Sequence, residues 1–90
     1  MLNFSNPSRN YDEAGRGVRF WGYDRTFEIS FFVEEDALTS ISPGTMTTEA
    51  GLLETFDENL ERIREVAGTI YARRRKGAYI YAYTLTKSDC

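Results

Sequence analysis

The chain has 90 residues, of which 41% are hydrophobic and 14% aromatic, and its formal net charge is -3. A chain of this length buries only roughly 60–65% of its unfolded surface, so we expect a single domain over residues 1–90. Its 14 acidic residues outnumber its 11 basic ones, which argues against a protein that works mainly by covering phosphates.

The first part of the chain predicts an N-terminal arm followed by three antiparallel strands. Turn-forming residues separate short segments with alternating polarity, which is typical of a meander. The expected elements are an arm at 1–8, strands near Arg9–Glu13, Val18–Tyr23 and Thr26–Glu34, a Gly-rich turn at Ala14–Gly17 and a tight turn at Asp24-Arg25.

The third of these strands shows which side of the sheet is buried. Its apolar residues recur at every second position, and Glu28, Ser30 and Glu34 share the other face. The predicted core side comprises Phe27, Ile29, Phe31 and Val33, joined by Val18 and Phe20 from the preceding strand.

Two helices are expected next. Glu34, Glu35 and Asp36 precede a short apolar stretch, as is typical of a helix start, and Ser42-Pro43-Gly44 should end this helix. A long helix is predicted from Thr47, a candidate cap, to Lys76. Its apolar stripe comprises Leu53, Phe56, Leu60, Ile63, Ala67 and Ile70, with Gly68 beside it, where a missing side chain would permit close approach to the sheet.

A fourth strand, Ala78–Leu85, should complete the sheet. We therefore predict an α+β fold: an antiparallel sheet, made of the three-stranded meander and the C-terminal strand, with one long amphipathic helix on one face and a short helix before it. Small Ala82 favours Ile80 and the alanines facing the helix, which places Tyr79, Tyr81 and Tyr83 on the opposite face. The reverse assignment, with the tyrosines in the core beside Leu85, stays open.

The basic run that precedes this strand has two interpretations. Arg73, Arg74, Arg75 and Lys76 would complement the negative end of the helix dipole, with Gly77 placed for a left-handed cap. Alternatively, the four cations would hold phosphates while the tyrosines stack on bases. We favour the structural interpretation, because a short basic run is a signal of low specificity.

The sequence lacks the residues of common catalytic and metal sites. It has no histidine and one cysteine, Cys90, so neither histidine-dependent nucleophiles nor thiolate metal clusters can form, and no internal disulfide is possible. The carboxylates of the long helix have the spacing of solvated ion pairs. We predict no enzyme activity, no cofactor and no metal. Without a leader or a long apolar run, we expect a soluble, cytoplasmic protein.

Several stretches resemble a bacterial family catalogued as domain of unknown function 1488. They are "NFSNPSRNYD", "VRFWGYD", "SFFVEEDAL", "TEAGLLETFDENLERIREVA" and "YTLTKSD". Cys90 departs from the family pattern, which has an aromatic residue at this place. The resemblance implies a compact α+β domain in bacterial cytoplasm, and it implies no activity and no site residues.

We therefore expect a small non-enzymatic module for interaction or self-association. Its candidate surface comprises Trp21, Tyr23, Phe32, Tyr79, Tyr81 and Tyr83, which we expect to be covered by the arm, by the short helix, by an unidentified protein partner or by a second copy in a homodimer. The alternative is nucleic-acid binding through the basic run and the aromatic face.

Overall fold

The structure is a computed structural model that describes residues 2–74 and 82–90. Its five strands form one sheet, and its three helices lie between β4 and β5 in the sequence. The elements are β1 (Leu2–Asn3), β2 (Arg9–Asp12), β3 (Gly17–Asp24), β4 (Phe27–Glu34), α1 (Glu35–Ile41), α2 (Glu49–Glu58), α3 (Leu60–Arg74) and β5 (Ala82–Leu85). The predicted α+β class is confirmed.

The sheet is mixed, and the parallel pair is at its C-terminal strand. Both β1 and β2 pair antiparallel with β3, which pairs antiparallel with β4. β5 pairs parallel with β4, with Phe31 opposite Tyr83. A parallel neighbour requires a crossover connection, and the three helices supply it. The expected wholly antiparallel sheet is therefore corrected at β5, and residues 78–81 of the predicted strand lie outside the described part of the chain.

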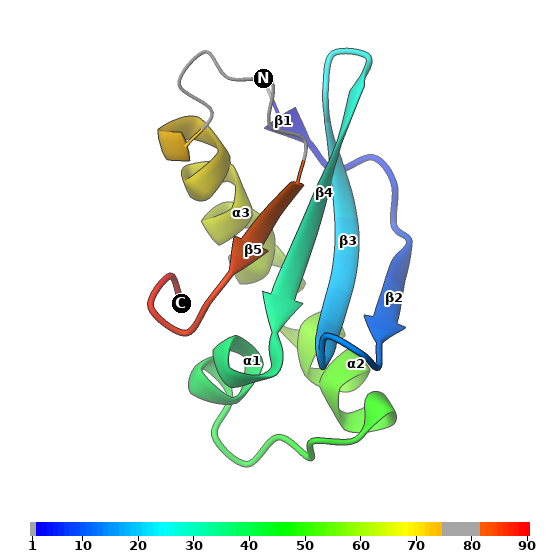
Figure 1. Cartoon of the computed structure of the whole chain (residues 1–90), viewed down its shortest axis with the longest axis vertical. Helices are drawn as coiled ribbons and strands as arrows, with labels where there is room; N and C mark the ends of the chain where they lie inside the picture. The colour runs from blue at the N-terminus through cyan, green and yellow to red at the C-terminus, as the bar shows by residue number, and fades with distance from the viewer. Residues whose placement is uncertain (1, 75–81) are drawn as a thin grey trace.

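One face of the sheet carries the core. In Figure 1 the strands lie in front of α2 and α3, and α1 lies below the end of β4. The buried hydrophobic residues come from both layers: Val18, Phe20, Ile29, Phe31, Val33, Ala37, Leu38, Leu52, Phe56, Ile63, Ala67, Ile70, Tyr83 and Leu85. Phe27, which was predicted in this core, is 53% exposed because it lies at the loop end of the β3–β4 hairpin, where it pairs with Asp24.

The N-terminal arm is part of this core. Leu2 and Phe4 pack against the buried cluster, and the Arg64 guanidinium lies 5.4 Å from the centre of the Phe4 ring. Gly22 makes room for this segment, since a Cβ there would lie 3.0 Å from both Leu2 and Phe4 side chains. Residues 2–4 therefore cover the helix side of the sheet and not the opposite aromatic face.

The predicted long helix is two helices that meet at Asn59. The Asn59 backbone leaves the helical region, at φ -117° and ψ 24°, and its side-chain amide donates to the Thr55 carbonyl at 2.9 Å. A side chain that bonds a carbonyl in this way competes with the helical pattern. The buried stripe also differs from the prediction: Leu52 is fully buried, whereas the predicted Leu53 and Leu60 are only half-buried.

The cap of α2 is one residue later than expected. Thr48 Oγ1, not that of Thr47, accepts a hydrogen bond from the Gly51 amide at 3.1 Å. Gly51 is required here, because a Cβ would lie 2.2 Å from the Met46 carbonyl oxygen. Gly68 is different, since a Cβ there would meet nothing within 4 Å, and the expected close approach to the sheet is wrong.

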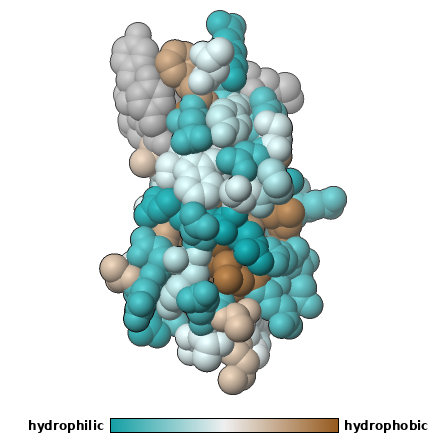
Figure 2. Space-filling view, turned by 90° about the vertical axis from the view of Figure 1, so that its right-hand side faces the viewer, coloured by the Kyte–Doolittle hydropathy of each residue, from teal (hydrophilic) through white to brown (hydrophobic). Residues whose placement is uncertain are grey.

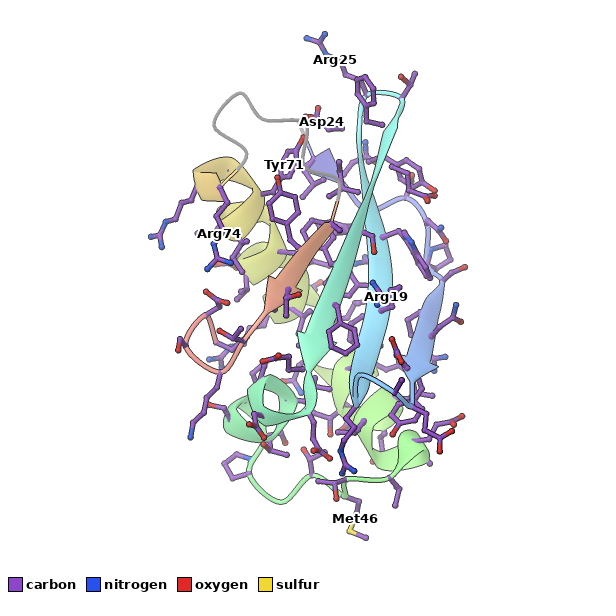
Figure 3. All side chains as sticks on the ribbon, in the orientation of Figure 1. Arg19, Asp24, Arg25, Met46, Tyr71 and Arg74 are labelled. Atoms are coloured by element: carbon purple, nitrogen blue, oxygen red, sulfur yellow. The ribbon has the colours of Figure 1, made fainter. Side chains whose placement is uncertain are left out.

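The β3–β4 hairpin has a two-residue loop, Arg25-Thr26, between the paired residues Asp24 and Phe27. The loop is shifted by one residue from the predicted turn at Asp24-Arg25. Tyr71 of α3 donates its hydroxyl proton to Asp24 Oδ2, which fixes the end of the hairpin to the helix layer. Figure 3 shows Tyr71 and Asp24 near each other, below Arg25 at the tip of the hairpin.

Arg25→Gly should stabilise the protein by about 0.5–1 kcal/mol, because Arg25 has φ +59°, a region that costs an L side chain but not glycine. Urea denaturation checks this. Arg16 is a matched control with φ +56°, but it also donates to Glu35 through two nitrogen atoms, so Arg16→Gly should gain less or lose stability. An Arg25→Gly variant that unfolds at lower urea than wild type would contradict the prediction.

Candidate functional site

The helix-free face of the sheet carries a cluster of aromatic and charged side chains, here called the open face. Strand alternation places Arg19, Trp21 and Tyr23 of β3 beside Ser30 and Phe32 of β4, and all five are half-buried. Exposed Glu28 lies on the same side, opposite Tyr23 in the register.

Arg19 is held in place at one end of the open face. Its guanidinium lies 5.2 Å from the centre of the Phe32 ring, and its Nη1 donates to Ser30 Oγ at 3.1 Å. Its Nη2 donates to Asp12 Oδ2 at 3.4 Å. Figure 3 shows Arg19 in front of the strands, on the side away from α2 and α3. Contacts on three sides fix the direction of this cation.

The Phe32 ring under Arg19 lies against the β2–β3 turn. A Cβ on Gly17 would lie 2.6 Å from Phe32 Cζ, and one on Gly15 would lie 2.9 Å from the same atom. Asp12 Oδ1 accepts the Gly15 amide proton at 3.0 Å, and this bond is the main reason that the pKa of Asp12 is lowered. Asp12 is therefore anionic and links the turn to Arg19.

The other end of the open face is acidic. Tyr23 donates its hydroxyl proton to Glu28 Oε2 at 2.9 Å, and the Asn6 amide donates to the same hydroxyl oxygen at 3.4 Å. Trp21 lies between this group and Arg19, two residues from each along β3. It is the only tryptophan of the chain.

The predicted aromatic surface is smaller than expected. Tyr83 is only 7% exposed, with its ring 5.9 Å from Phe31 and 5.6 Å from Tyr71, so it belongs to the core and not to the open face. Ala82 and Thr84 are the exposed residues of β5. The reverse assignment is thus correct for this strand. Tyr79 and Tyr81 lie outside the described residues. Trp21, Tyr23 and Phe32 are on the open face as predicted.

The basic run is only partly described, since Arg75 and Lys76 lie outside the described residues. Arg73 and Arg74 form the last turn of α3, where cations oppose the helix dipole. Arg74 also donates to Asp89 Oδ1 at 3.1 Å, and its side chain is 52% exposed (Figure 3). Arg74 therefore has a partner within the chain, which leaves it less available to a phosphate.

Asp89→Asn should destabilise the protein by about 1 kcal/mol near neutral pH and by less in acid. Burial raises the Asp89 pKa, but hydrogen bonds from the Thr86 amide and hydroxyl, together with Arg74 and Arg73, outweigh it and keep this pKa below its ordinary value. A lowered folded-state pKa gives stability above the unfolded-state pKa that is lost as the pH falls through the folded-state value.

Urea unfolding between pH 2 and pH 7 measures the difference in stability between wild type and Asp89→Asn. This difference should narrow below the ordinary Asp pKa of about 3.9. Arg74→Gln is the control, and it should keep most of the pH dependence because both Thr86 bonds remain. A wild type and an Asp89→Asn variant with parallel pH profiles would contradict the assignment.

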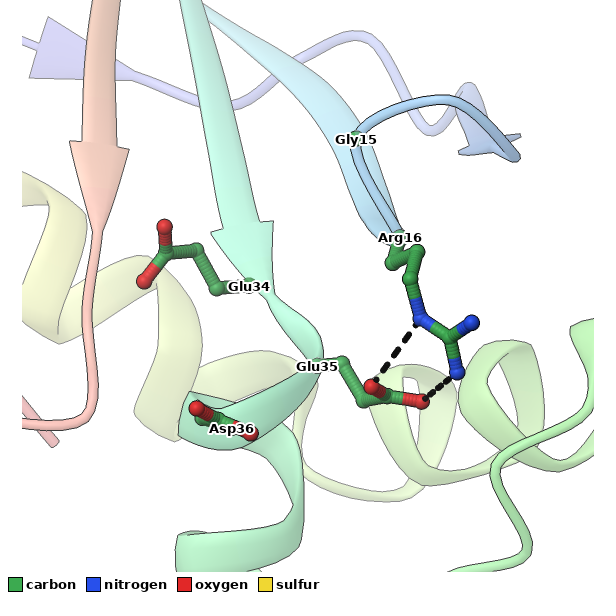
Figure 4. A pocket seen from close by; sticks show the side chains of 5 residues that line it. All are labelled: Gly15, Arg16, Glu34, Glu35 and Asp36. Carbon is green, nitrogen blue, oxygen red and sulfur yellow. Dashed lines mark hydrogen bonds and ion pairs between the residues drawn. The ribbon is translucent and has the colours of Figure 1, made fainter.

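A shallow depression of about 160 Å³ lies at the start of α1, lined by Gly15, Arg16, Glu34, Glu35 and Asp36. Figure 4 shows Arg16 in a two-pronged contact with Glu35, at 3.0 and 3.3 Å. Glu35 is thus engaged in joining the turn to the helix start. Within residues 2–74 and 82–90, no group of three carboxylate or cysteine side chains is placed to hold a metal ion.

The edge of the sheet at β2 offers a weaker candidate. Figure 2 shows the side of the molecule that carries β2, and its surface is mostly hydrophilic with small, separate hydrophobic patches. Arg9 of β2 forms a two-pronged ion pair with Asp57 of α2, at 2.8 and 2.9 Å. This edge is held by polar contacts and carries no large apolar patch.

Sequence reasoning missed Arg19 and Glu28 as parts of the site. The signal was available, because both alternate with core residues and therefore share a face with Trp21 and Tyr23.

In the described part of the chain, no helix is long and apolar enough to span a membrane.

Comparison with known families gives one result. The model of the family described as "Protein of unknown function (DUF1488)" matches residues 2–82, which confirms the resemblance expected from the sequence. The match ends at the first residue of β5, so most of this strand lies beyond it. Comparison with curated proteins and with solved structures returned no match.

Proposed function

Because the chain belongs to the DUF1488 family, whose description states no activity, we propose its function from the open face: it is a non-enzymatic interaction module. The open face is its binding surface. The proposal includes the cytoplasmic location expected from the sequence.

The observation that carries this proposal is the row Arg19, Trp21 and Tyr23 on one face of one strand. Tryptophan, tyrosine and arginine are the residues most enriched among those that dominate binding energy at protein interfaces. Here Arg19 and Tyr23 are already held by neighbouring side chains, so little side-chain freedom is lost on binding.

Charge favours a protein partner over a nucleic acid. The open face carries Asp12 and Glu28 beside its cation Arg19, and these carboxylates would repel a phosphate backbone. Aromatic stacking of bases is the use that an open sheet face has in RNA-binding domains, but there the flanking surface is basic.

Affinity capture from the organism that makes the protein tests the proposal. Wild-type bait and Met46→Ser bait should retain a protein partner after nuclease treatment, whereas Trp21→Ser bait should lose it. Met46 is the matched control because it is 68% exposed and lies far from the open face, in the loop before α2. Capture that survives Trp21→Ser would contradict the proposal, and capture lost on nuclease treatment would favour nucleic-acid binding.

A further inference from the structure

We infer that the partner of the open face is a second copy of this chain, packed face to face with the two β3 strands antiparallel. This inference rests on the proposed function, and it names the partner through the distribution of charge around Trp21.

The open face places a guanidinium and a carboxylate at equal spacing from Trp21, and the Arg19 guanidinium also contacts Asp12 at 3.4 Å at the edge of this face. Arg19 precedes Trp21 by two residues on β3, and Tyr23, whose hydroxyl is bonded to Glu28, follows it by two. At about 3.4 Å per residue, the cationic and anionic ends each lie about 7 Å from the central ring along the strand. A surface with this arrangement is complementary to itself when it is turned end to end.

A two-fold axis between the sheets, perpendicular to β3 and over Trp21, performs this turn. It stacks the two tryptophans near the axis and sets Arg19 of one copy opposite the Tyr23–Glu28 pair of the other, twice per dimer. Arg19 already leans toward β4, the strand that carries Glu28, because it donates to Ser30 and covers Phe32. The axis parallel to β3 is disfavoured, since it would bring Arg19 against Arg19.

The size of the molecule sets an upper limit to the contact area of such a dimer. The Cα extents are 38 × 24 × 24 Å, so the broad side, of which the open face is a part, covers on the order of 900 Å², against roughly 800 Å² per partner in a standard interface. Aligned sheets in known proteins pack about 10 Å apart, a gap that tryptophan and arginine side chains can fill from both sides. The interface would be small, and we expect micromolar affinity.

Charge reversal tests the antiparallel arrangement in a Cys90→Ser background, which excludes disulfide cross-links. Wild type should sediment as a dimer at micromolar to millimolar concentration, with the emission of its single tryptophan shifted to the blue as dimer forms. Arg19→Glu and Glu28→Arg should each weaken self-association about tenfold or more, because each sets like charges opposite each other. An equimolar mixture should form a heterodimer that again has two ion pairs, one between the introduced Glu and the introduced Arg and one between the native Glu28 and the native Arg19.

Arg19→Glu places a carboxylate beside Asp12 and can disturb the fold, so a second pair of variants repeats the test. Arg19→Met and Glu28→Met should each weaken the dimer, because either substitution removes both ion pairs, and the double variant should be no weaker than either single variant. Additive losses in this cycle, or a mixture of charge variants that stays monomeric, would overturn the antiparallel pairing.

A wild type that stays monomeric at millimolar concentration would overturn the second copy as partner. If a monomeric wild type still captured another protein in a Trp21-dependent way, the interaction module would stand with a different partner. If the capture also failed to depend on Trp21, the proposed function would fall as well.

Discussion

Tyr83→Ala is expected to lower the free energy of unfolding by about 3–5 kcal/mol, the usual cost of removing a buried aromatic ring. Tyr83 is 7% exposed, and its ring lies between Phe31 of the neighbouring strand and Tyr71 of α3. Its removal would leave a cavity where β5 meets the helix layer. Because β5 is short and pairs only with β4 in the described sheet, the loss should also detach this strand.

Thr84→Ala is the matched control, since Thr84 is the next residue of the same strand and is exposed. This substitution should change stability by no more than about 0.5 kcal/mol. Urea unfolding of both variants shows whether Tyr83 or Thr84 is on the buried face of β5. Equal and small effects would mean that Tyr83 lies on the surface, as the initial interpretation of the sequence had it.

The two faces of the strands were predictable where polarity alternated with apolar side chains. In β4, Ile29, Phe31 and Val33 alternate with Glu28, Ser30, Phe32 and Glu34, of which only Phe32 is apolar, and all three are buried as predicted. In the predicted strand Ala78–Leu85 both sets of residues are compatible with burial, because alanine and isoleucine alternate with tyrosine. Periodicity then separates the sets without saying which one faces the helices. The space between β4 and α3 decides which set is buried. The sequence of the strand alone gives no information about that space.

The break in the long helical segment at Asn59 and the strand with which β5 pairs depended on interactions beyond the local sequence pattern. The apolar spacing continues through Asn59 with little change, so only the weak helix preference of asparagine indicated a break. The parallel pairing of β5 follows from where the three helices between β4 and β5 bring the chain. Arg19 and Glu28 could be recognised as two opposite charges on either side of Trp21 only when the register of β3 and β4 was known.

Gly17→Ala is expected to destabilise the protein by about 2–3 kcal/mol, although alanine is the smallest possible addition. An added Cβ would lie 2.3 Å from the Val33 carbonyl oxygen and 2.6 Å from Phe32 Cζ. The first of these atoms is backbone of β4 beside the last pairs of the β3–β4 ladder, so it cannot move aside without disturbing this pairing. The second belongs to the ring under Arg19, so the substitution should also displace the cation of the open face.

Gly68→Ala provides the opposite case in the same fold. A Cβ on Gly68 would meet nothing within 4 Å, and alanine is favoured over glycine inside a helix, so this variant should be stabilised by about 0.5–1 kcal/mol. Urea unfolding gives both values. Gly17→Ala should in addition weaken self-association, measured by sedimentation under conditions where the variant is folded, whereas Gly68→Ala should not. If Gly17→Ala were as stable as wild type, the tight contact among Gly17, Phe32 and Val33 would be wrong, and with it the fixed position of Arg19.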